Sequence, residues 1–265
     1  MTKTKRPQPE PVHRDPKGDD VSAHDKPDPG KLSAERLPGV ATSELPFETE
    51  QLRSALAAFL SQNYSFAGSR IARLGSVKWG AYAFFDYDGE PIYVGQTKES
   101  LGTRIRRHLT NQRSDAVAMK VLDPFEVHSI EVWPLPQYQT TLGTDRSAIA
   151  HLNALEYTLF QRLLTLSEFG AVLNEKDPPP ATVEVKVPVS IRGHVVSGEV
   201  SRLRDHPDLR IARRASTVAK LAQVISERKV NRGLRRTLLA QAKRLQSLAQ
   251  KRFDSASEVD DSEID

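Results

Sequence analysis

Apolar residues recur at helical spacing in several segments of the chain. One segment begins after Pro46, and others cover about 99–112, 147–167, 207–227 and 231–253. Positions three or four residues apart lie on one face of a helix, so each segment predicts an amphipathic helix. The apolar positions of the first three are Leu52, Leu56, Phe59 and Leu60; Leu101, Ile105 and Leu109; and Ile149, Leu152, Leu155, Leu159, Leu163 and Leu166.

A second pattern, with a period of two residues, predicts strands. The stretch GAYAFFDYDGEPIYVGQT, from Gly80 to Thr97, predicts two strands around the dipeptide Asp88-Gly89, which favours a two-residue type I′ hairpin turn because both residues tolerate positive φ. The segment 125–133 predicts a further strand with an irregularity, and alternating valines between 182 and 200 predict one or two more. The chain therefore mixes helices with a few strands.

A two-residue turn fixes the register of this hairpin. It pairs Phe84 with Tyr93 and Tyr82 with Gly95, and all four positions then share one face. Since glycine has no side chain, we expect open space above the phenol of Tyr82. Aromatic cross-strand pairs commonly stabilise sheets, so the hairpin alone fits a structural role as well as a binding site.

Composition bounds the class of protein. Hydrophobic residues make up 38% of the 265 residues, the mean hydropathy is −0.49, and no run reaches the roughly eighteen apolar residues of a membrane span. The N-terminus lacks the apolar core of a secretory signal, and the absence of cysteine excludes disulfides and thiolate metal sites. We therefore expect a cytoplasmic location. Residues 1–42, rich in Pro, Asp, Lys and Gly, predict a disordered arm.

Charge is concentrated near the C-terminus. From Arg204 to Phe253 there are fourteen Lys and Arg against three Asp and Glu, whereas residues 254–265 hold six acids and no base. Such a basic block favours a polyanionic partner such as nucleic acid, although a solvated helical face explains the charge equally well. The acidic segment predicts a disordered tail that shields the basic surface.

Two helices carry candidate catalytic groups. Arg104 and His108 are four residues apart and so share one helix face, as a phosphate site requires, although a surface pair has the same spacing. Glu156 falls among the leucines of its helix, on the apolar side. A buried carboxylate there must be paired with a cation, either a metal or one of the arginines.

Together these residues resemble the GIY-YIG nuclease superfamily. The resemblance covers about residues 79–177 and comprises Gly80-Ala81-Tyr82, Tyr93-Val94-Gly95-Gln96-Thr97, Arg104 with His108, Glu156, and Asn174. Ala81 and Val94 stand where the family name has Ile, and both remain apolar. The resemblance implies an α+β fold with a small central antiparallel sheet flanked by helices.

The resemblance also implies a role for each residue in cutting nucleic-acid phosphodiesters. Glu156 would hold one divalent metal ion, Mg²⁺ or another such as Mn²⁺, and Arg104 would stabilise the pentacovalent phosphate. Tyr82 would deprotonate the attacking water, Tyr93 and His108 would position groups or relay protons, and Asn174 would order the site. Residues expected to bind substrate are Gly95, Gln96, Thr97, Lys98 and Arg107.

The general base needs assistance. An unperturbed tyrosine has a pKa of about 10, so Tyr82 requires a nearby cation or a proton relay at neutral pH. His108 and Lys98 are both candidates for this helper.

The resulting organisation is a helical lead-in over 43–78, a nuclease domain over 79–180, a short β segment over 181–202, and a basic helical hairpin over 203–253. The hairpin would dock on the core, form a homodimer or contact phosphates. The expected function is a metal-dependent endonuclease that hydrolyses DNA phosphodiester bonds, of the restriction or defence type. The alternatives are a repair or mobile-element nuclease and a non-catalytic nucleic-acid-binding or scaffold protein.

Overall fold

The computed structural model describes residues 47–65, 72–110, 121–174, 176–181, 183–230 and 232–262. All of them belong to one compact unit, Leu45–Asp265. The arm expected over 1–42 lies outside the described residues. None of the described helices is both long and apolar enough to cross a bilayer.

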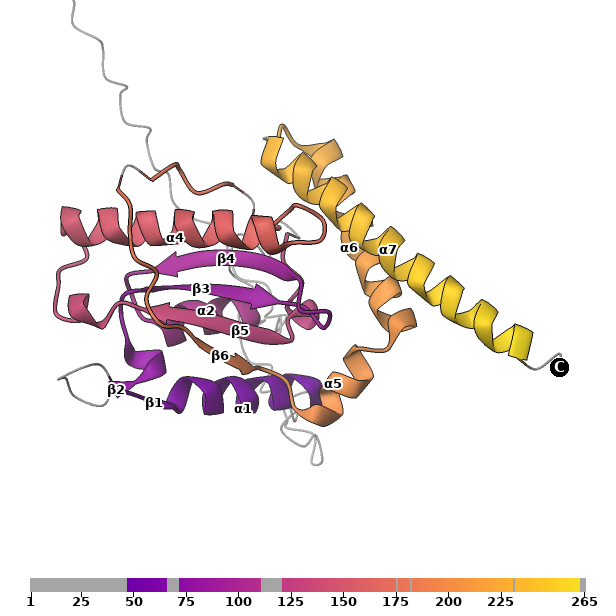
Figure 1. Ribbon diagram of the computed structural model, residues 1–265, viewed down its shortest axis with the longest axis horizontal. Coiled ribbons are helices and arrows are strands. Elements are labelled where there is room, and N and C mark those ends of the chain that lie inside the picture. The colour runs from indigo at the N-terminus through magenta and orange to yellow at the C-terminus, as the bar shows by residue number, and fades with distance from the viewer. Residues whose placement is uncertain are drawn as a thin grey trace, which may run out of the picture. The chain divides into compact units, whose positions relative to one another are not determined.

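The unit combines helices with short strands (Figure 1). The helices are α1 (Phe47–Ser61), α2 (Leu101–Leu109), α4 (Arg146–Leu166), α5 (Gly198–Arg204), α6 (Pro207–Glu227) and α7 (Arg232–Ser262). The strands are β1 (Asn63–Tyr64), β2 (Ala72–Arg73), β3 (Gly80–Phe85), β4 (Pro91–Thr97), β5 (Ser129–Pro134) and β6 (Ile191–His194).

A four-stranded antiparallel sheet lies at the centre of the unit, in the order β4-β3-β5-β6. Side chains alternate across β3, so Tyr82 and Phe84 join the core beneath α1 and α2, whereas Ala81 and Ala83 join the core beneath α4. Helices therefore cover both faces of the sheet (Figure 1), and the expected α+β fold is confirmed.

The predicted register of the hairpin formed by β3 and β4 is confirmed, although the predicted turn is wrong. Tyr82 pairs with Gly95 and Phe84 with Tyr93. The loop has three residues, because Asp86 N–H donates to Glu90 O (3.0 Å) and Gly89 supplies the positive φ of +78°. This one-residue difference is cancelled where the register shifts between Phe84 and Phe85, so that the pairs farther from the turn keep their predicted partners.

The segment beyond the proline run differs from expectation. Residues 183–189 form no strand, and Pro188 lacks the N–H that a ladder there would need. β6 follows, and it pairs with β5 as the outer strand of the central sheet. The segment 181–202 therefore holds one strand, as one of the two predicted possibilities; β6 belongs to the central sheet, and α5 begins at the end of that segment.

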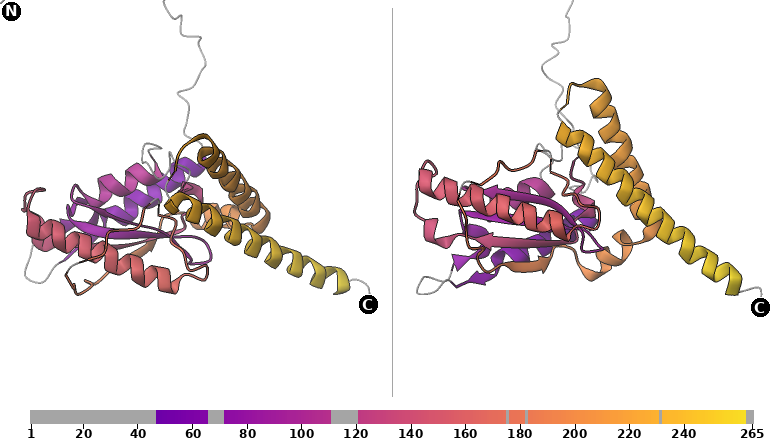
Figure 2. Two further views of the ribbon diagram at one scale, coloured as in Figure 1. Left: turned by 90° about the horizontal axis from the view of Figure 1, so that it is seen from above. Right: turned by 45° about the horizontal axis from the view of Figure 1, so that its top comes forward.

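α6 and α7 form an antiparallel helical pair, with α6 bounded as predicted and the two helices side by side in both views (Figure 2). Their apolar positions, including Leu221, Ile225, Leu234 and Leu248, are buried. The prediction of a disordered acidic tail is also wrong for residues 254–262, because α7 continues to Ser262. Residues 254–262 contain no Pro or Gly to end the helix.

Arginines of this helical pair dock it on the turn between β3 and β4. Asp86 is 1% exposed, and its Oδ2 accepts hydrogen bonds from Arg214 (2.9 Å) and Arg244. Its Oδ1 accepts the backbone N–H groups of Asp88 and Glu90, each at 2.9 Å. The carboxylate is thus fully hydrogen-bonded, and part of the basic block serves the fold rather than a polyanion.

Replacing this carboxylate should loosen the whole unit. Asp86→Ala leaves Arg214 and Arg244 buried without their shared partner, and we expect it to lower the free energy of unfolding by about 3–5 kcal/mol. Urea unfolding measures the change. Asp208→Ala is the matched control, because it removes only exposed contacts, with Arg252 and His206, and should have a much smaller effect. Equal losses for the two variants would contradict the central role of Asp86.

Candidate active site

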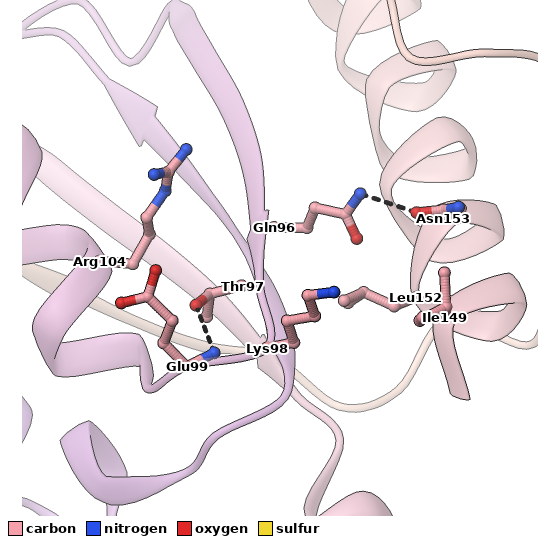
Figure 3. A pocket seen from close by; sticks show the side chains of 8 residues that line it. All are labelled: Gln96, Thr97, Lys98, Glu99, Arg104, Ile149, Leu152 and Asn153. Carbon is pink, nitrogen blue, oxygen red and sulfur yellow. Dashed lines mark hydrogen bonds between the residues drawn. The ribbon is translucent and has the colours of Figure 1, made fainter. Parts of the chain in front are cut away.

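The candidate site lies beside β4, the edge strand of the sheet, where α2 and α4 approach from opposite faces (Figure 3). Ser100 caps α2 by accepting the backbone N–H of Thr103 at 3.1 Å. The apolar stripe Leu101, Ile105 and Leu109 is buried against the sheet, which brings His108 and Arg104 to the tyrosines of the hairpin.

Tyr82 is the centre of a buried polar cluster. Its side chain is 0% exposed, and its hydroxyl is 2.8 Å from His108 Nε2 and 3.3 Å from the Arg104 Nε–H donor. The open space expected above this phenol does not exist, because the ring lies across Gly95. A Cβ at that position would be only 2.5 Å from the hydroxyl oxygen. Glycine is therefore required there so that Tyr82 can reach His108 and Arg104.

The cluster favours uncharged tyrosine and histidine. Burial raises the pKa of Tyr82 well above its usual value, and Tyr93 adds to this, while the guanidinium of Arg104 opposes it. Burial and the charges of Arg104 and Arg107 lower the pKa of His108 to about 3. Because the hydroxyl oxygen already accepts from Arg104, we assign its proton to the hydrogen bond with the neutral His108.

Tyr93 completes the aromatic wall. It is half-buried and stacks on Phe84 with ring centroids 5.8 Å apart. Its ring centroid is 5.0 Å from that of His108 and 6.3 Å from that of Tyr82. The two tyrosines expected on one face are thus neighbours around one histidine.

Glu156 faces the same cluster from α4. It is half-buried, and burial raises its pKa to about 7, against the opposing effects of a hydrogen bond from Gln96 and the charge of Arg104. No Lys or Arg among the described residues forms a salt bridge with it, so the arginine pair considered from the sequence is not formed. This carboxylate is therefore desolvated without a direct cationic partner.

Asn174 acts on the backbone of β4. Its side-chain Oδ1 accepts the N–H of Val94 (3.0 Å), and its Nδ2 donates to the carbonyl of Val94 (2.8 Å). Its own carbonyl accepts the hydroxyl of Thr237 on α7 at 3.3 Å. The amide thus fixes the strand that carries Tyr93 and Gly95.

The residues expected to bind substrate differ in availability. Thr97 is buried and accepts the N–H of Glu99 (3.1 Å), and Arg107 forms an ion pair with Glu99 (2.7 Å). Lys98 is exposed and donates to the carbonyl of Gly143 at 3.0 Å. All three side chains therefore already have partners, and Thr97 and Lys98 also line a pocket.

Asn153 is a site residue that the sequence analysis missed. Its Oδ1 accepts a hydrogen bond from Gln96 at 2.8 Å, which ties α4 to β4 (Figure 3). It precedes Glu156 by three residues, so both lie on one face of α4. This three-residue spacing from Glu156, a candidate catalytic carboxylate, is the sequence feature that could have identified Asn153.

Residues 78–162 match the family model described as the GIY-YIG catalytic domain. This chain carries a GIY-YIG catalytic domain. The match includes Tyr82, Tyr93, Arg104, His108 and Glu156, which the structure brings to one site. Searches of curated proteins and of solved structures gave no match. The match supports a nuclease of the GIY-YIG type for residues 78–162.

The donor set of the GIY-YIG domain fits a weakly chelated hard cation. No group of three or more His, Asp or Glu that could surround a metal occurs in the described parts of the chain. Glu156 offers one desolvated carboxylate. Oxygen donors of this kind suit Mg²⁺, which keeps several waters and takes ligands from phosphate.

The buried carboxylate of Glu156 should cost stability at alkaline pH. Its raised pKa means that the native state holds a proton the unfolded chain releases, so the stabilisation is full below about pH 4.5 and is lost as pH rises through about 7. Without added metal, Glu156→Gln should therefore stabilise the protein at pH 8 by up to about 3 kcal/mol. Urea unfolding at pH 8 and pH 4.5 measures this, and a difference between variant and wild type that does not change with pH would contradict it.

Proposed function

We propose that this protein is a divalent-metal-dependent endonuclease that hydrolyses DNA phosphodiester bonds. The observation that carries the proposal is that His108 and Arg104 both contact the hydroxyl of Tyr82, in the same site as the desolvated carboxylate of Glu156. A proton acceptor, a phosphate-binding cation and a metal ligand are the groups that this hydrolysis needs.

Tyr82 and His108 would work as a relay. The water proton passes to the Tyr82 oxygen while the Tyr82 proton passes to His108 Nε2. Because the raised pKa of Tyr82 disfavours a free phenolate and the low pKa of His108 disfavours a free imidazolium, both transfers are concerted with attack on phosphorus. The proton on His108 is then available for the leaving oxygen.

Arg104 would have one role before the substrate binds and another afterwards. In the free protein its Nε–H donates to the Tyr82 hydroxyl, and its side chain is half-buried. On binding, the guanidinium would turn to the phosphate, where its fork stabilises the charge of the transition state and uncovers Tyr82. Glu156 would hold the metal; a bound Mg²⁺ would supply Lewis-acid stabilisation of phosphate oxygens.

Plasmid cleavage tests the proposal. The wild type should nick supercoiled plasmid in Mg²⁺, and Glu156→Ala should reduce the rate by at least about a hundredfold. EDTA should abolish the wild-type activity. Equal cutting by both proteins, or none by either, would overturn the proposal and favour a non-catalytic nucleic-acid-binding or scaffold protein.

The biological role we propose is a restriction or defence enzyme. Sequencing the ends of the cut plasmid distinguishes this role from the others. A restriction enzyme yields one short sequence at every cut, whereas a repair or mobile-element nuclease prefers a branched structure or a single long site.

The proposed DNA contact outside the active site is the solvent face of α7. Arg232, Arg235 and Lys243 are exposed there, and no described carboxylate pairs with them. By contrast, Arg236 pairs with Asp177 and Arg252 with Asp208. The apolar side of α7 packs within the helical pair, so contact with phosphates is the proposal favoured for these helices over a homodimer.

The salt dependence of DNA binding distinguishes the exposed cations of α7 without a described carboxylate partner from those in ion pairs. In the Glu156→Gln background, Arg235→Gln with Lys243→Gln should reduce the slope of log affinity against log salt by about 2, because two phosphate contacts are lost. Arg252→Gln is the matched control on the same helix and should leave the slope nearly unchanged. Fluorescence anisotropy with duplex DNA measures both, and equal slopes for all three proteins would exclude the α7 face.

A further inference from the structure

A pocket of about 290 Å³ adjoins the catalytic cluster, between the end of β4 and the first turns of α4 (Figure 3). Ile149 and Leu152 of α4 form its apolar wall, and Gln96 and Asn153 form an amide edge. Lys98 and Arg104 place two cations at its margin. The catalytic roles assigned to Tyr82, His108 and Glu156 do not use this pocket.

The amide edge is pre-ordered and incompletely bonded. Gln96 Nε2 donates to Asn153 Oδ1 at 2.8 Å, which fixes the orientation of both amides. Gln96 Oε1 is buried and accepts no hydrogen bond from any described residue. A buried acceptor without a donor is unfavourable, so a ligand that brings an N–H group to this oxygen relieves that cost.

The chemistry of the walls selects one class of ligand. A flat group with apolar faces and a polar edge matches an aliphatic wall beside two amides, and a nucleobase is such a group. Glutamine and asparagine amides pair with the donor and acceptor edges of bases. The pocket volume is at the small end for ligand sites, which suits a single base rather than several.

The position of the pocket connects it to the scissile phosphate. Asn153 precedes Glu156 by about one turn of α4, or roughly 5 Å along the helix. Arg104 is shared, since it binds Tyr82 and also borders the pocket. A nucleotide whose phosphate reached Arg104 would thus have its base beside Ile149 and Leu152.

We infer that this pocket is a nucleobase subsite, which takes the base of a nucleotide next to the cleaved bond and reads it through Gln96 and Asn153. The inference rests on the proposed function for the identity of the substrate. It adds a determinant of cleavage position within the catalytic domain itself.

Fluorescence of 2-aminopurine tests occupancy without any cutting. In the Glu156→Gln background, oligonucleotides carrying 2-aminopurine at successive positions are titrated with protein. One position should change fluorescence at least about twofold, because its base leaves the stack for an apolar pocket. Ile149→Trp fills the pocket and should abolish that change. Gln161→Ala, an exposed amide on the same helix, should leave it intact.

Cleavage provides the second readout. Asn153→Ala in the active protein should weaken the base preference at one position beside the cut by about tenfold, with Gln161→Ala again as control. If plasmid is cut while Ile149→Trp retains the fluorescence change, or no position responds, the subsite is wrong and the nuclease proposal stands. If plasmid is not cut but Ile149→Trp loses the fluorescence change, the nuclease proposal is wrong and the nucleobase subsite stands. Failure of folded protein to bind any oligonucleotide at low salt overturns both.

Discussion

The buried carboxylate of Asp86 is the interaction on which the rest of the structure depends. It lies at the turn between β3 and β4, and it accepts four hydrogen bonds from two backbone groups and two arginines. A buried ion is tolerable only when it is bonded this completely. The same four bonds shape the three-residue turn and attach the C-terminal helical pair, so the geometry of the hairpin and the docking of distant helices share one cause.

The electrostatics of the candidate site arise mainly from desolvation. Burial pushes Tyr82, His108 and Glu156 towards their neutral forms, and Arg104 is the cation that lies among them. Neutral groups cost little to keep in a dry site, while their capacity to exchange protons is retained. The candidate site therefore exists at low electrostatic cost, and under the proposed nuclease function the phosphate would bring the charge that Arg104 meets.

The features that were predictable from sequence are local or have a fixed period. The facing of Tyr82 and Gly95 follows from strand alternation, and the limits of α6 follow from helical spacing. The pairing of β6 with β5 was missed because only tertiary contacts decide which short alternating segment finds a partner. Burial of Arg214 and Arg244 was missed for a similar reason, since a basic helix looks the same in sequence whether its arginines face carboxylates or water. The contact of Asn153 with Gln96 could not be predicted from sequence, because it depends on the packing of α4 against β4.

The amide of Asn174 has a consequence for association between copies of the protein. β4 is an edge strand, and an uncovered edge of alternating apolar residues is a template on which another strand can add. By bonding both the N–H and the C=O of Val94, one side chain takes the place of a neighbouring strand, and Leu173 N–H does the same for the carbonyl of Ile92. The edge beside the active site is thus protected against intermolecular β-sheet growth along Ile92–Val94, while the end that carries Gln96 stays clear for a ligand.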